Sequence, residues 1–152
     1  MLIDLSHMNQ AGFEDVVRLS TAPLVATHSN VHALSASPRN LTDRQLDQIR
    51  ESSGMVGLNY SVGFLRADGM GSSDTGLDMM VRHIDYLVDK LGEDHVGLGS
   101  DFDGCTVPDS IKDVTGVPNL FRALSEHGYD LPLIAKLARD NWLDCLDRCL
   151  QT

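Results

Sequence analysis

Residues 96–104 read VGLGSDFDG, a short apolar segment that runs directly into two carboxylates held between glycines. Its apolar residues can fill a core, while Gly97 and Gly99 let neighbouring backbone approach closely. Taken alone, an acid such as Asp101 in this kind of loop is more often a turn or helix-capping residue than a catalytic group. A functional role for this stretch is favoured because two earlier predicted strands also end in polar side chains, both of them histidines.

Four short segments have the pattern of buried strands: residues 2–7, 24–26, 55–60 and 96–98. The first ends at His7, and the second leads into His28. A single histidine at a strand end is more often a surface or hydrogen-bonded residue than a metal ligand. Because each segment is followed by a predicted helix, the chain is expected to form parallel strands joined by right-handed crossovers.

Helical periodicity fills the segments between the strands. Thr42 and Gln45 have capping-box spacing, which predicts a helix start. Residues 77–91 carry the strongest apolar stripe, and His83 on it is interpreted as a packed or hydrogen-bonded residue rather than a ligand. Near the C-terminus, Asn141 is expected to end a helix or to act as a side-chain clamp. Other boundaries are helix stops at Gly54, Gly92 and Gly128, and a long loop over residues 63–76.

Composition limits the class of protein. The 152 residues are 42% hydrophobic and 22% charged, which is ordinary for a globular domain. A net charge of −10 repels phosphate backbones and argues against a nucleic-acid partner. Three cysteines without CxxC spacing indicate neither a disulfide framework nor a cysteine-built zinc site. No run has the length of a membrane span and no signal peptide is visible, so we expect no membrane segment and a cytoplasmic location.

The candidate functional residues follow the C-terminal ends of the predicted strands. This placement is the rule for open α/β sheets and for (β/α)8 barrels. No glycine-rich phosphate fingerprint follows any strand, which disfavours the open sheet. A closed barrel needs eight strands and about 250 residues. We therefore predict an α/β fold in which residues 1–152 form one half-barrel domain, with four βα units and C-terminal helices.

Two histidines and an aspartate suggest metal chemistry at the barrel mouth. His7 and His28 lie one βα unit apart and would occupy adjacent strand ends, where two neutral imidazoles suit zinc. Asp101, two strands further on, could accept a proton from a metal-bound water. Arg39 offers a fixed fork for a carboxylate. The spacing favours a metal-dependent hydrolase.

Several segments resemble, in order and spacing, the renal or membrane dipeptidase family of the amidohydrolase superfamily. They are IDLSHM (3–8), ATHSN (26–30), PRNLTD (38–43), HIDY (83–86) and GLGSDFDG (97–104). The resemblance implies a barrel enzyme with two zinc ions that hydrolyses dipeptides by attack of a zinc-bridging hydroxide on the peptide carbonyl.

The resemblance also implies roles for individual residues. His7 and His28 would be ligands of the second zinc, from the fifth and sixth barrel strands. Asp101 would handle protons at the bridging water, from the eighth strand. Arg39 would bind the C-terminal carboxylate of the dipeptide, and Phe64 would line the pocket for its side chain.

The chain also departs from the family pattern. Family members carry an early His-x-Asp pair on the first strand, a metal-bridging glutamate and a further histidine that polarises the substrate carbonyl. None of these is matched here, because the one His-x-Asp of this sequence, at residues 83–85, lies in the predicted helix 77–91. The chain therefore resembles a C-terminal half that holds the ligands of one metal at most. A half-barrel should expose two sheet edges and an apolar inner face, so we expect self-association or pairing with an N-terminal half.

Two hypotheses follow from this incomplete match. In the first, the chain is the C-terminal half of a zinc dipeptidase, with weak zinc binding and little turnover alone. In the second, it is a non-catalytic half-barrel module for assembly or binding. Another amidohydrolase reaction, such as deamination, is disfavoured by the Arg-Asn segment and the SDFDG stretch.

Overall fold

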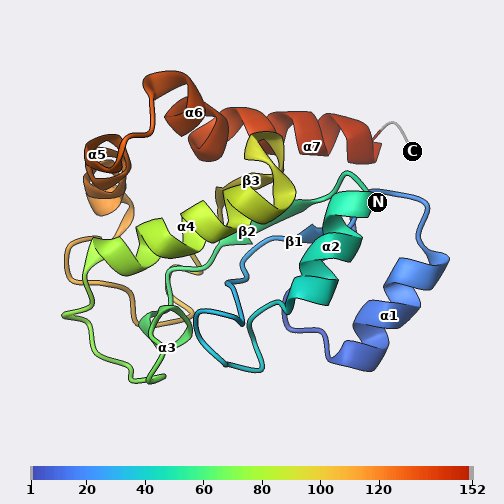
Figure 1. Ribbon diagram of the computed structural model, residues 1–152, viewed down its shortest axis with the longest axis horizontal. Helices are drawn as coiled ribbons and strands as arrows, with labels where there is room; N and C mark the ends of the chain where they lie inside the picture. Colours follow the sequence, from blue (N-terminus) through green and yellow to red (C-terminus); the bar gives the residue numbers. More distant parts are fainter. Residues whose placement is uncertain (1, 151–152) are drawn as a thin grey trace.

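The computed structural model describes residues 2–150 and is organised around a parallel sheet of three strands. These are β1 (Val25–Ala26), β2 (Met55–Leu58) and β3 (Val96–Leu98), paired in the order β1-β2-β3. Both pairs are parallel, as predicted (Figure 1). Every carboxyl end of a strand therefore lies at the same edge of the sheet.

The first predicted strand, residues 2–7, is reduced to an isolated parallel bridge between Asp4 and Val25. The Asp4 side chain explains why pairing stops there. Its Oδ1 atom accepts hydrogen bonds from the backbone N–H groups of Ser6 and Thr27, each at 3.0 Å. These groups are consequently satisfied by a carboxylate rather than by a strand ladder.

Residues 2–150 form seven α-helices. They are α1 (Gln10–Leu19), α2 (Asp43–Glu51), α3 (Val62–Leu65), α4 (Leu77–Leu91), α5 (Val117–His127), α6 (Leu131–Ala135) and α7 (Asn141–Leu150). Of these helices, α2, α4 and α7 contact the strands. Short 3-10 turns at Glu93–His95 and Val114–Gly116 and a π-helical turn at Lys136–Asp140 complete the described chain. Among the residues described, no helix is long and apolar enough to span a bilayer.

Most helix boundaries match the sequence expectations. The capping box of Thr42 and Gln45 begins α2, and Gly92 ends α4. Two expectations were wrong. Ser53, not Gly54, takes the left-handed conformation after α2, with a φ of 54°. Helix α3 occupies the start of the segment expected to be a loop, because Leu65 can bury its side chain in the core.

The sheet has no exposed apolar face, which corrects the expectation for a half-barrel. Ala26, Val56, Leu58 and Val96 belong to the main core, which helices α2 and α4 also build. The alternate positions Val25 and Met55 instead pack with residues of α7, namely Trp142, Cys145 and Cys149. In Figure 1, α7 runs above the strands while α4 and α2 lie in front of them. Helix α7 thus covers the face of the sheet that a half-barrel was expected to expose.

Helix α7 also satisfies part of the β3 backbone. The Asn141 side-chain amide donates to the carbonyls of Glu93 and Val96, each at 2.7 Å. The Trp142 indole N–H donates to the Leu98 carbonyl at 3.0 Å. The predicted clamp role of Asn141 is confirmed, and the Val96 and Leu98 carbonyls of β3 and the Glu93 carbonyl of the preceding turn have donors on α7.

His83 is a buried structural residue, as predicted. Only 1% of it is exposed. Its Nδ1 atom accepts from the Val31 backbone N–H at 3.1 Å, and its Nε2 atom donates to the Leu65 carbonyl at 3.0 Å. Burial lowers the pKa of His83 to about 4, partly opposed by the Leu65 hydrogen bond. A second proton, on Nδ1, would point at the Val31 N–H. The folded protein therefore keeps the His83 imidazole neutral.

We predict that acid destabilises the fold through His83. Because its pKa is lower in the folded state than the value of about 6.5 expected when unfolded, the unfolded chain gains a proton first as the pH falls. Stability should be fully present above about pH 6.5 and should fall towards pH 4, by up to about 3 kcal/mol from this residue. Urea unfolding across this range, compared with His83→Gln, measures the effect. Equal pH dependence in both proteins would contradict it.

Candidate metal centre

His7 and His28 meet at the carboxyl edge of the sheet. Their Nε2 atoms lie 2.9 Å apart and their ring centroids 5.0 Å apart. His7 follows the Asp4–Val25 bridge and is exposed, whereas His28 comes two residues after β1 and is partly buried. Two imidazoles from different strand ends thus direct the same ring nitrogen to one point.

Gly57 on β2 and Gly99 directly after β3 leave room for the backbone that follows β1. A Cβ atom added to Gly57 or Gly99 would lie 2.0 or 1.9 Å from the Thr27 carbonyl oxygen. The backbone of His28 is then held by its N–H, which donates to Ser6 Oγ at 3.0 Å. The sequence expectation that Gly99 admits close backbone is confirmed, and its consequence is the placement of His28.

Two polar residues stand behind His28. Thr27 Oγ1 lies 2.7 Å from His28 Nδ1 and donates to Asp4 Oδ2 at 2.5 Å. Burial alone would raise the pKa of Asp4, but hydrogen bonds from Thr27 and Ser6 outweigh it and lower that pKa. Asp4 is therefore an ionised acceptor at neutral pH.

Asp101 is held at the same edge by Asn59, which follows β2. The Asn59 side chain is fully buried and donates to Asp101 Oδ2 at 2.9 Å. Its own oxygen accepts from the Ser61 backbone N–H at 2.7 Å, which fixes the amide orientation. One Asp101 oxygen is consequently occupied by a positioned donor.

The backbone is strained where these groups lie. His7, Asp101 and Asp103 have φ values of 70°, 56° and 67°, a region that side chains other than glycine adopt at some cost. Strained backbone that the surrounding structure holds in place is frequent at functional sites. The strain is thus a second sign that this edge of the sheet has a role besides folding.

Arg39 approaches the site from the loop before α2. Its guanidinium lies 5.5 Å from the centre of the Phe64 ring. Burial lowers the pKa of Arg39, while the charges of Asp101 and Asp4 act in the opposite direction. The buried Nε and Nη2 atoms have no hydrogen-bond partner among residues 2–150. Unpaired buried donors of this kind are costly, and a carboxylate is their natural acceptor.

A hollow of about 550 Å³ opens beside these residues. It is lined by His7, Phe64 and Asp101, together with loop residues that follow β2 and β3. His28 and Arg39 do not line it; His28 lies against His7, and the Arg39 guanidinium lies over the Phe64 ring. Three of the five predicted site residues therefore line one hollow, and the other two lie next to residues of its lining.

The donor set fits a divalent cation only in part. Two converging Nε2 atoms suit zinc, but a zinc site needs four ligands or three ligands and a water. Within residues 2–150 no three His, Cys, Asp or Glu side chains are grouped so that they could hold a metal ion. The chain thus offers two ligands of a site that further groups would have to complete.

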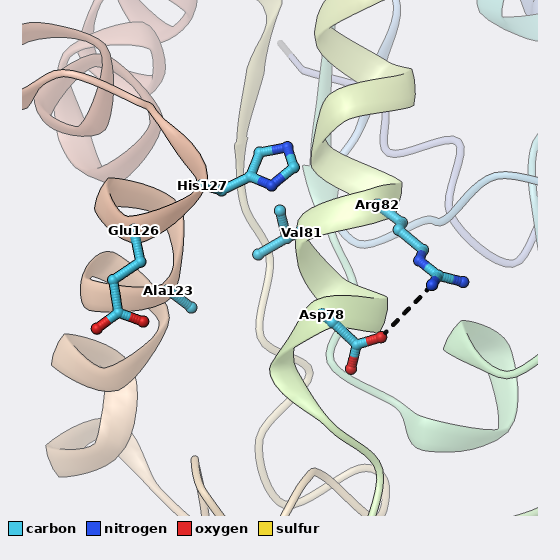
Figure 2. Close-up of a pocket in the computed structure, with 6 residues that line it drawn as sticks. All are labelled: Asp78, Val81, Arg82, Ala123, Glu126 and His127. Atoms are coloured by element: carbon cyan, nitrogen blue, oxygen red, sulfur yellow. Dashed lines mark ion pairs between the residues drawn. The ribbon is translucent and has the colours of Figure 1, made fainter.

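A second hollow lies between α4 and α5, away from the sheet edge (Figure 2). Figure 2 shows its lining side chains, among them Asp78, which pairs with Arg82 at 3.8 Å, and His127. The His127 ring is already paired with Asp85 at 2.7 Å. No converging ligands comparable to His7 and His28 occur among these lining residues.

Sequence reasoning missed Asp4 and Thr27 as parts of the site. Both lie in the segments that carry the two histidines, DLSH (4–7) and ATHS (26–29). A signal was present, because a carboxylate and a hydroxyl at the ends of adjacent parallel strands must come close together.

The fold and the site together define a class of protein. Parallel βα units that deliver two imidazoles and a carboxylate to the carboxyl edge of a sheet are typical of metal-dependent hydrolases built on (β/α)8 barrels. The chain belongs to the membrane dipeptidase family, Peptidase family M19, which matches it over residues 1–150.

Relatives and solved structures agree with this assignment. An uncharacterised protein in the pqqA 5′ region of Klebsiella pneumoniae is 56% identical over 151 residues, covering 99% of this chain and 56% of that protein. The dipeptidase ataJ of Aspergillus terreus is 38% identical over 146 residues, covering 93% of this chain and 34% of that protein. The chain thus spans little more than half the length of the first of these relatives.

Among solved structures, the metallopeptidase named dipeptidase AC superposes with a TM-score of 0.96 at 60% identity, covering 98% of this chain and 44% of that one. A metallopeptidase from Rhodobacter sphaeroides, liganded with a phosphinate mimic of the dipeptide L-Ala-D-Ala, gives 0.95 at 61% identity, covering 96% and 42%. The predicted fold class, parallel βα units forming about half of a barrel, is confirmed.

Proposed function

We propose that this chain is part of a metal-dependent dipeptidase and contributes one half of its active site. The observation that carries the proposal is the convergence of His7 and His28, whose Nε2 atoms lie 2.9 Å apart at the carboxyl edge of the sheet. Membership of the membrane dipeptidase family supports the same conclusion.

Zinc is the cation that we propose for this site. His7 and His28 would hold it, because neutral imidazole nitrogens are preferred zinc ligands. When bound, such a cation supplies Lewis-acid polarisation of the peptide carbonyl and a nucleophile at neutral pH. Asp101, oriented by Asn59, would take up and return the proton at its carboxylate.

A dipeptide is the proposed substrate. Arg39 offers a guanidinium with unpaired donors, which would bind the C-terminal carboxylate and so exclude longer peptides. Phe64 lines the hollow and would contact the side chain next to that carboxylate. The Rhodobacter sphaeroides relative at 61% identity was solved with a dipeptide mimic, which supports a substrate of this size.

Pairing with an N-terminal half would complete the metal site. The chain supplies two imidazoles, and the remaining ligands have to come from elsewhere. Helix α7 also presents an exposed apolar stripe at helical spacing, formed by Leu143, Leu146 and Leu150. An unpartnered stripe of this kind favours contact with a second chain or a second copy.

The alternative is a non-catalytic module for binding or assembly. It is favoured by one observation, namely that the chain covers both faces of its own sheet. A unit with its own core could be retained for assembly without chemistry. The proposed experiment separates the two functions.

We predict that the chain alone binds zinc weakly, hydrolyses dipeptides little, and gains activity from a complementary segment. The test mixes it with the part of the Klebsiella pneumoniae relative outside the matched region and measures zinc stoichiometry, association and hydrolysis of a simple dipeptide. His7→Ala and His28→Ala should each lower the gained activity by at least about 100-fold, since even outer partners of a metal ligand contribute about 10–100-fold. His127→Gln, in the hollow between α4 and α5, is the matched control away from the site.

Two outcomes would contradict this function. Substantial turnover by the isolated chain would show that no complementary half is required. A stable complex with bound zinc but no hydrolysis would favour the assembly module.

Arg39 should favour dipeptides with a free C-terminal carboxylate over the same dipeptides with an amidated C-terminus. In the complemented protein, Arg39→Met should raise the KM for a dipeptide by about 10–100-fold, the equivalent of one charged hydrogen-bonded contact. The KM for the same dipeptide with an amidated C-terminus should change little. Arg39→Lys, which keeps the charge but loses the fork, should be intermediate. Equal effects on both substrates would show that Arg39 has another role.

A further inference from the structure

Asp4, Thr27 and His28 form a directed chain of hydrogen bonds. Asp4 Oδ1 is occupied by two backbone N–H groups, and Asp4 Oδ2 accepts from the Thr27 hydroxyl. The same hydroxyl oxygen lies 2.7 Å from His28 Nδ1. Asp4 and His28 do not contact each other closely, since His28 Nδ1 and Asp4 Oδ2 are 3.9 Å apart. Thr27 is therefore the link between them.

The positions of the protons along this series of hydrogen bonds determine the tautomer of His28. An ionised carboxylate can only accept, so the single hydroxyl proton of Thr27 is directed at Asp4. The Thr27 oxygen then has only lone pairs to offer His28, and Nδ1 must carry a proton. A neutral imidazole has one N–H, so the Nε2 atom of His28 is left bare.

The tautomer of His28 also determines which imidazole is the donor in its short contact with His7. Since His28 Nε2 carries no proton, the 2.9 Å contact requires His7 Nε2 to be the donor. His28 is thus ready to bind a cation, whereas His7 has to give up or move its Nε2 proton first. The two ligands differ although they look equivalent in the sequence.

We propose that Thr27, held by Asp4, is the positioning residue that presets His28 for metal binding through its Nδ1–H tautomer. The tautomer part depends only on the geometry of this chain. The consequence for affinity rests on the proposed function, in which His28 is a metal ligand.

The first test reads the tautomer directly in the metal-free chain. Long-range 1H–15N correlation spectra of the histidine-labelled protein, above the imidazole titration range, distinguish Nδ1–H from Nε2–H, and His28→Gln assigns the signal. The wild type and Thr27→Ser should show mostly Nδ1–H. Thr27→Val, which cannot accept a hydrogen bond, should lose this preference.

Asp4→Asn provides a sharper variant that keeps the shape of the site. The backbone N–H groups hold the amide oxygen at the Oδ1 position, so the amide nitrogen faces Thr27. Thr27 would then accept from Asn and donate to His28 Nδ1, which should move the proton to Nε2. If Thr27→Val and Asp4→Asn both kept the wild-type tautomer, the proposal would be overturned.

The second readout is the affinity for Co²⁺, which is measured through the visible absorption of the bound ion. Thr27→Ser should bind like the wild type, and Thr27→Val and Asp4→Asn about 10–100-fold more weakly. Equal affinity in all four proteins would refute the presetting role. A wild type that binds no Co²⁺ but shows the expected tautomers would instead refute the metal centre and leave the positioning of His28 standing.

Discussion

The parallel pairing of three short strands is the constraint on which the rest of the molecule depends. Because β1, β2 and β3 run in the same direction, the residues after them must gather at one edge. The absence of side chains at Gly57 and Gly99 leaves room for the Thr27 carbonyl, which lies directly before His28 in the chain. A side chain at either glycine would collide with that backbone, so fold and site have the same requirement.

The site is a hydrogen-bonded network in which most members are held by a neighbour. Asn59 holds Asp101, and Thr27 links His28 to Asp4. Arg39 differs from these residues, because its buried Nε and Nη2 donors have no partner among residues 2–150. A carboxylate that reached them would satisfy both donors, which suits recognition of a small anionic ligand.

Much of this could be predicted from the sequence. Three of the four strand positions, the α2 capping box and the roles of His83 and Asn141 follow from local patterns. Strand-end placement predicts His7, His28 and Asp101 as site residues, whereas Phe64 follows only from the family resemblance. The sequence did not reveal that α7 covers the second face of the sheet. That contact joins Trp142 and Cys145 to Val25 and Met55, which lie far away in the chain and have no periodic relation to each other. The loss of the first strand was equally hidden, because it depends on Asp4 taking two backbone donors.

The central claim is that His7 and His28 bind one divalent cation. It is tested most directly by anomalous X-ray diffraction from crystals of the chain soaked in zinc. At a zinc concentration high enough to fill a weak two-ligand site, a single peak should appear about 2.1 Å from both Nε2 atoms, with the Thr27 contact to His28 Nδ1 preserved. A peak bound to only one of the two imidazoles, or zinc found only at other residues, would contradict it.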